Sequence, residues 1–215
     1  MGITLIKSSM QVNSIAIKQL TYDYQDRLFE RLDLIIESGS LVQITGKNGA
    51  GKSTLLKILA GILPIEPHSM FINDCNDRQV FALYQQRIRY IGHQPGCKAE
   101  LTVDENLQYD SVIYNQMLPM NLVDHLTHWQ LNHYQHNLVQ YLSYGQKRKV
   151  SMLKLTCFPG QIWLLDEPYV GLDKAACEFL TKIINSHVQN QGIVILSTHQ
   201  EIANFGLVAE KIINL

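Results

Sequence analysis

The stretch Gly46-Lys47-Asn48-Gly49-Ala50-Gly51-Lys52-Ser53 fills every fixed position of the pattern G-x-x-x-x-G-K-[ST]. It lies between a strand-like run, Leu41–Thr45, and a helix-like run, Thr54–Leu63. Its glycines let backbone N–H groups turn inward around a polyphosphate, and the helix that follows points its positive end at the same anion. We expect Lys52 to reach the β- and γ-phosphates and the Ser53 hydroxyl to bind Mg²⁺. The loop and the adjoining Thr54 therefore predict a nucleoside triphosphate site.

Length and composition limit the other possibilities. The 215 residues are 46% hydrophobic and 17% charged, with a net charge of −1, so no basic surface predicts a nucleic acid partner. The four cysteines form no C-x-x-C pair, which indicates reduced thiols in a reducing compartment. No apolar run approaches the roughly 20 residues that cross a bilayer. We expect a cytosolic protein, unless another chain holds it at a membrane.

The chain reads as one domain over residues 13–215, preceded by a loose leader, 1–12. Ser14–Leu20 and Leu32–Glu37 have strand patterns separated by turn chemistry, and they predict an N-terminal antiparallel β portion. Residues from about 100 to 150 change to a helical period and predict a helical subdomain.

Strand and helix patterns alternate in the last third of the chain. We expect a helix at Gln146–Leu155, a buried strand at Ile162–Leu165, a helix at Lys174–Gln189 and a buried strand at Ile193–Ser197. This alternation predicts an α/β fold with a mixed or parallel sheet core and crossover helices.

The run Ile162-Trp163-Leu164-Leu165-Asp166-Glu167 places two carboxylates at the end of a buried strand. Asp166 at that position can hold Mg²⁺ through water beside the phosphate loop, and Glu167 can polarise the attacking water. The alternative is a strand that simply ends in acidic surface residues. The phosphate loop upstream favours the catalytic interpretation.

The pentapeptide Leu142-Ser143-Tyr144-Gly145-Gln146 directly precedes the predicted helix. The Ser143 hydroxyl, the bare Gly145 N–H and the helix start together make a second anion site. One chain has no use for two γ-phosphate sites so far apart. We therefore expect a head-to-tail dimer in which this turn closes over the ATP of the partner copy.

In this order, the three motifs resemble the ATP-binding-cassette (ABC) family of P-loop NTPases, whose signature is L-S-G-G-Q in its commonest form; Tyr144 departs from it. The resemblance implies that Gly171-Leu172-Asp173 is the D-loop, which touches the partner copy. It also implies that His199 hydrogen-bonds the γ-phosphate and acts in catalysis with Lys52 and Glu167. Tyr24 is placed to stack on adenine, with Tyr22 as the competing candidate.

The resemblance further implies a glutamine that contacts Mg²⁺ shortly before the helical subdomain. Here the chain offers His93 and Gln94 within Tyr90-Ile91-Gly92-His93-Gln94-Pro95-Gly96. The register favours His93, whereas the side-chain type favours Gln94. We assign the nucleotide and metal contact to Gln94.

Within the family, the chain is similar to the ATPase subunit of the cytochrome c maturation system, the CcmA type. The similar stretches are Asp26-Arg27-Leu28-Phe29, Gly92–Gly96 with Glu100-Leu101-Thr102, and Ser197–Gln200. The resemblance implies an integral-membrane permease and haem-handling membrane proteins as partners. It implies a peripheral position on the cytoplasmic face of the bacterial inner membrane. ATP hydrolysis would drive haem export or release a haem-loaded chaperone, and both roles stay open.

Two alternatives stay open. In the first, the chain is the ATPase of another small ABC transporter or a non-transport cassette protein. Its single cassette and its lack of inserted heptads argue against the non-transport class.

The second alternative concerns a metal or haem site, which is suggested by the spacing of His125, His128, His133 and His136. No cysteine or carboxylate joins them, so a solvated face or a permease contact is favoured. Mg²⁺ is the expected metal.

Overall fold

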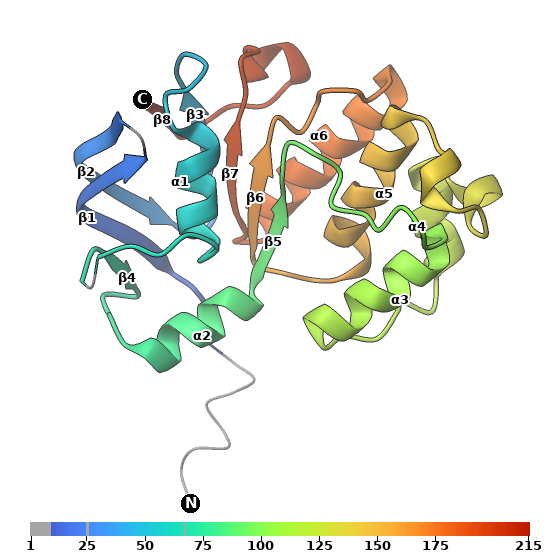
Figure 1. The fold of residues 1–215 in the computed structure, drawn as a ribbon, viewed down its shortest axis with the longest axis horizontal. Coiled ribbons are helices and arrows are strands. Elements are labelled where there is room, and N and C mark those ends of the chain that lie inside the picture. The colour runs from blue at the N-terminus through green and yellow to red at the C-terminus, as the bar shows by residue number, and fades with distance from the viewer. Residues whose placement is uncertain (1–9, 25, 67) are drawn as a thin grey trace, which may run out of the picture.

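The computed structural model describes residues 10–24, 26–66 and 68–215, and within these ranges five parallel strands form the central sheet. Their spatial order is β5-β6-β7-β3-β8, and every neighbouring pair is parallel (Figure 1). The strands are β3 (Leu41–Thr45), β5 (Ile88–Ile91), β6 (Ile162–Asp166), β7 (Ile193–Ser197) and β8 (Lys211–Asn214).

Both faces of this sheet are buried, and the alternation of side chains explains how. In β6, Ile162 and Leu164 point into one hydrophobic cluster, whereas Trp163 and Leu165 point into the other. Successive residues of a strand face opposite sides, so apolar runs without polar interruption need a cover on each face. Helix α1 (Lys52–Leu59) packs against β6 and β7 in the first cluster, and α6 (Lys174–Gln189) contacts β7 in the second.

A second sheet forms in the described part of the chain, and its two long strands come before the first strand of the central sheet in the sequence. It has the order β2-β1-β4, with β1 (Ser14–Tyr24), β2 (Asp26–Glu37) and β4 (Met70–Ile72), and both of its pairings are antiparallel. Helix α1 lies between the two sheets (Figure 1). The predicted fold class, with its N-terminal antiparallel portion, is confirmed. The hairpin extends beyond the predicted strand ends, because bulges let β1 and β2 pair almost to their turn.

The remaining helices gather on the other side of the central sheet, away from the N-terminal sheet, except α2 near β4 (Figure 1). Helix α5 packs against both α3 and α4. Capping boxes start two of them, with Thr102 and Glu105 at α3 and Ser143 and Gln146 at α5. Their bounds are α2 (Arg78–Gln86), α3 (Val103–Tyr114), α4 (Leu122–His128) and α5 (Tyr144–Cys157), with 3₁₀ turns at Asn132–Tyr134, Val139–Tyr141 and Ile202–Phe205.

The end of the predicted leader packs with the domain. Val12 is fully buried; its N–H donates to Gln161 Oε1 (2.8 Å) and its carbonyl accepts from Gln161 Nε2 (2.7 Å). Residues 11–12 therefore belong with the folded part, whereas the sequence assigned them to the leader. Of the rest of that leader, Met10 is described and residues 1–9 lie outside the described ranges. No helix in those ranges is both long and apolar enough to span a bilayer.

Packing on both faces of β6 generates a stability prediction. We expect Leu164→Ala to lower the free energy of unfolding by about 2–5 kcal/mol, because Leu164 is fully buried and its loss leaves a cavity. Ile212→Ala, on the edge strand β8 where the side chain is 62% exposed, should change it by less than about 1 kcal/mol. Urea denaturation of both variants measures the difference. Equal losses would contradict the buried, central position of β6.

Candidate functional site

The phosphate loop has the backbone that its glycines predict. Gly51 is the N-cap of α1 in a left-handed conformation (φ 95°), and a Cβ there would lie 2.8 Å from Phe29 Cζ. A glycine N-cap offers no side-chain acceptor to the first turn of α1. The N–H groups of that turn have no partner within the helix, so the helix start is suited to an anion.

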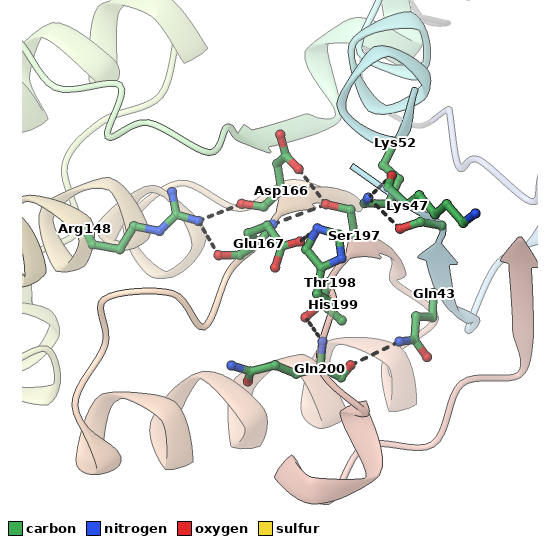
Figure 2. Close-up of polar contacts among 11 residues, drawn as sticks. Gln43, Lys47, Lys52, Arg148, Asp166, Glu167, Ser197, Thr198, His199 and Gln200 are labelled. Atoms are coloured by element: carbon green, nitrogen blue, oxygen red, sulfur yellow. Dashed lines mark hydrogen bonds and ion pairs between the residues drawn. The ribbon is translucent and has the colours of Figure 1, made fainter. Parts of the chain in front are cut away.

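Lys52 is the first residue of α1 and is largely buried. Its Nζ donates to the carbonyls of Gly46 (2.9 Å) and Lys47 (3.0 Å), which holds the ammonium group over the loop (Figure 2). A buried cation next to the start of a helix provides strong attraction for a polyphosphate.

Two carboxylates stand at the end of β6, as the sequence predicted. Asp166 is paired in register with Ser197 of β7, whose hydroxyl donates to Asp166 Oδ1 (2.5 Å). The N–H of Glu167 donates to the carbonyl of Ser197 (3.0 Å). Ser197 thus fixes both the Asp166 side chain and the Glu167 backbone.

Glu167 and His199 face each other (Figure 2). Glu167 Oε1 lies 3.5 Å from His199 Nε2, and within the described residues this buried oxygen has no hydrogen-bond partner. A buried carboxylate oxygen without a partner is costly, unless a water or a ligand satisfies it. The arrangement suits a base that takes a proton from water.

One cavity of about 1040 Å³ joins these groups. This is at the upper end of the size range of small-molecule sites. The structure therefore brings together the loop, both carboxylates and His199. The cavity is lined by Asn48, Gly49, Ala50, Gly51, Lys52, Ser53 and Thr54 together with Leu28, His93, Asp166, Glu167, Val170, His199, Gln200 and Leu215.

The residues around His93 differ from the sequence assignment. His93 lines the cavity, whereas Gln94 is exposed and is absent from the lining. The reason is that Arg148 holds the carbonyls of Gly92 and His93, which fixes how the turn meets the cavity. In this structure His93, and not Gln94, reaches the cavity, and the contact of Gln94 with nucleotide and Mg²⁺ stays a prediction.

Ser143 and Gly145 lie at the start of α5 and are not part of the cavity lining. The Ser143 hydroxyl accepts from the N–H of Gln146 (3.3 Å). A Cβ at Gly145 would lie 2.7 Å from the carbonyl oxygen of Gly171, and one at Gly171 would lie 2.5 Å from the Tyr144 ring. The turn at Ser143–Gln146 therefore packs on Gly171 of its own chain, and the nucleotide contact of Ser143 and Gly145 in a dimer stays a prediction.

The adenine-stacking residue has no described geometry, because the side chain of Tyr24 lies outside the described part of the chain. The competing candidate, Tyr22, packs its ring against Phe29, with 6.4 Å between ring centroids. Tyr22 therefore supports the N-terminal sheet, and the role of Tyr24 stays a prediction.

Among the four histidines between residues 125 and 136, His128 has a packing role. The ring of His128 stacks on Phe179 of α6, with centroids 5.0 Å apart. Burial and the neighbouring His128 lower the pKa of His125. In the described ranges, no three His, Cys, Asp or Glu side chains form a group that could hold a metal ion.

Two basic residues near the site were not predicted from the sequence. Arg148 is fully buried and reaches the main chain beside Asp166 and Glu167, and burial lowers its pKa. Lys149 forms an ion pair with Asp173 (2.5 Å), and its hydrogen bond lowers the pKa of that carboxyl. Both basic residues lie shortly after the pentapeptide Leu142–Gln146, but nothing in the sequence indicates their partners.

Comparison with known proteins agrees with this geometry. The profile of the family described as "ABC transporter" matches residues 29–170. The chain is 37% identical over 186 residues to the cytochrome c biogenesis ATP-binding export protein CcmA of Yersinia pestis bv. Antiqua (strain Nepal516), covering 86% of this chain and 85% of that one. It is 36% identical to the protein of the same name from Vibrio cholerae serotype O1, covering 87% and 91%.

Solved structures share the fold. An ATP-binding subunit of an ABC transporter superposes with a TM-score of 0.82 at 24% identity, covering 95% of this chain and 86% of that one. A dimeric ATP-binding cassette bound to ADP and Pi superposes with a TM-score of 0.75 at 22% identity, covering 94% of each chain. The motif order, the shared cavity and these matches lead to one conclusion: the chain belongs to the ABC transporter family as an ATP-binding subunit.

Proposed function

We propose that this chain is the ATP-hydrolysing subunit of a membrane complex for c-type cytochrome biogenesis. The observation that carries the proposal is its similarity to CcmA proteins, at 31–37% identity over most of both chains. The complex would use ATP either to export haem or to release a haem-loaded chaperone. The cavity supports the ATPase part of the proposal independently of the relatives.

The phosphates would lie along the N–H groups of residues 48–54, with Lys52 on the β- and γ-phosphates. The hydroxyl of Ser53 and the carboxylate of Asp166 line the same cavity and are oxygen donors of the kind that Mg²⁺ prefers. This donor set fits the ion, which when bound neutralises charge developing on the phosphates. The Ser197 hydroxyl keeps Asp166 in place for that role.

Hydrolysis requires a group that orients and deprotonates water. Glu167 Oε1 is buried beside the cavity and unpaired by hydrogen bonds in the described residues, so we assign it as the general base. His199, 3.5 Å away, would hold the γ-phosphate and the water in line.

The site is complete when a second copy supplies Ser143 and Gly145 in a head-to-tail ATP sandwich. An integral-membrane permease would hold the pair at the cytoplasmic face of the bacterial inner membrane, next to haem-handling proteins. The relatives are named cytochrome c biogenesis ATP-binding export proteins, which supports this placement.

Lys52→Ala should abolish ATP binding. Removing the buried ammonium leaves the phosphates without their main cation, and we expect the dissociation constant to rise at least about a hundredfold. Equilibrium binding of a fluorescent ATP analogue measures it. Lys57→Ala, on the same helix but outside the cavity lining, is the control and should bind like the parent. Retained affinity in Lys52→Ala would refute the assigned phosphate site.

Glu167→Gln should keep ATP binding and reduce kcat by about a hundredfold or more, because the amide cannot accept the proton of water. The variant should also accumulate as an ATP-bound dimer, detectable by size-exclusion chromatography with light scattering. Hydrolysis at the parent rate would show that another group is the base.

The cellular role is tested by deleting the gene from its bacterium. We expect haem-stained c-type cytochromes to disappear and b-type cytochromes to persist, and the parent gene but not Glu167→Gln to restore the loss. Co-purification from membranes should recover a permease with the parent chain. Normal c-type cytochromes in the deletion strain would overturn the biogenesis role and leave the ATPase assignment intact.

A further inference from the structure

A fully buried arginine connects the two segments that carry His93 and Glu167. Arg148 lies in α5, and its Nη1 donates to the carbonyls of Gly92 and His93 (3.1 Å to the latter). Its Nη2 donates to the carbonyls of Asp166 (2.7 Å) and Glu167 (2.9 Å) (Figure 2). One guanidinium thus bridges the end of β5 and the end of β6.

The bridge uses main-chain oxygens, which suits a positioning role. The planar guanidinium presents its N–H donors in a fixed fork, so the two pairs of carbonyls are held at a fixed separation. Because Arg148 bonds the carbonyls of Asp166 and Glu167, it directs their peptide groups and leaves their carboxylates for the cavity.

Glu167 needs such support. Its φ is +48°, a left-handed conformation that is uncommon for a residue other than glycine. Its N–H is held by Ser197 and its carbonyl by Arg148, so both flanking peptide groups are fixed. The direction of the Glu167 carboxylate toward His199 follows from this backbone conformation.

The same face of α5 also contacts residues 96–97, which follow His93 in the chain. Lys154 Nζ donates to the Gly96 carbonyl (3.3 Å), and Cys97 Sγ lies 3.4 Å from Ser151 Oγ. Arg148, Ser151 and Lys154 are three residues apart in sequence, which places them along one side of the helix. The segment around His93 is therefore bonded to α5 at several positions along the helix.

We propose that Arg148 is a positioning residue for ATP hydrolysis, which holds the Glu167 carboxylate and the His93 turn in one arrangement around the cavity. The proposal rests on the proposed ATPase function. It requires that loss of Arg148 slows the chemical step while the phosphate loop, on the other side of the cavity, still binds ATP.

Arg148→Met removes the bridge at similar volume, and Arg89→Met is the matched control. Arg89 is also fully buried and also donates to main-chain carbonyls, among them those of Ile88 (2.7 Å) and Phe158 (2.8 Å), but these partners do not line the cavity as His93, Asp166 and Glu167 do. We expect Arg148→Met to lower kcat about a hundredfold, with the dissociation constant of the fluorescent ATP analogue within threefold of the parent. Arg89→Met should lower the melting temperature and keep kcat within threefold.

Arg148→Lys serves as the second variant, and it decides the matter if Arg148→Met does not fold. A single ammonium cannot span both pairs of carbonyls, so kcat should be partly restored, to about a tenth of the parent value. The proposal is overturned if kcat stays within threefold of the parent in the folded Arg148 variants. Equal losses of kcat in Arg89→Met, or a loss of ATP affinity that matches the loss of kcat, overturn it as well. A parent protein without ATPase activity would refute the proposed function itself.

Discussion

The site depends on the register between β6 and β7. Asp166 pairs with Ser197, so a hydroxyl meets a buried carboxylate and the next N–H along the chain finds a carbonyl acceptor. A slip of one residue would turn every side chain of β6 to the opposite face and move Asp166 away from the phosphate loop. The apolar alternation of Ile162–Leu165 opposes such a slip, because both faces of the strand are buried against different helices. The same packing that stabilises the core therefore sets the position of the two carboxylates at the end of β6.

Local signals explain what the sequence could predict. Helix α6 and strand β7 have the predicted bounds. Asp173 caps the start of α6, and an uninterrupted apolar run defines β7. Helix α2 and the edge strand β8 were not predicted; β8 exposes most of its side chains and so lacks the apolar run of a buried strand. The phosphate loop and the acidic strand end were predictable from spacing, because their chemistry fixes the residue types. The role of Arg148 was not, because its partners are main-chain carbonyls, which leave no mark in the sequence. The placement of His93 rather than Gln94 in the cavity depends on those same contacts.

Helix α5 is more than a cover for the sheet. Its first turn belongs to the signature pentapeptide. Arg148 then donates to the main chain at the end of β6, and Lys149 forms an ion pair with Asp173, the N-cap of α6. Tyr144, where the family's commonest signature has glycine, fills the space over Gly171. The aromatic ring is thus accommodated by the D-loop glycine of the same chain. Signature turn and D-loop form one packed surface, and a second copy would meet them together.

The left-handed backbone at Glu167 shows why these contacts belong to function. Such a conformation costs a residue with a Cβ about 1–2 kcal/mol, and glycine or asparagine would adopt it more readily. A glutamate here is therefore unfavourable for folding, unless the surrounding hydrogen bonds enforce it. Ser197 and Arg148 supply those bonds at the two neighbouring peptide groups. The Glu167 carboxylate oxygen lies buried next to His199 without a hydrogen bond in the described residues, which leaves it available to water. The strain and the unsatisfied oxygen are both explained if the chain is organised to activate a water at this point.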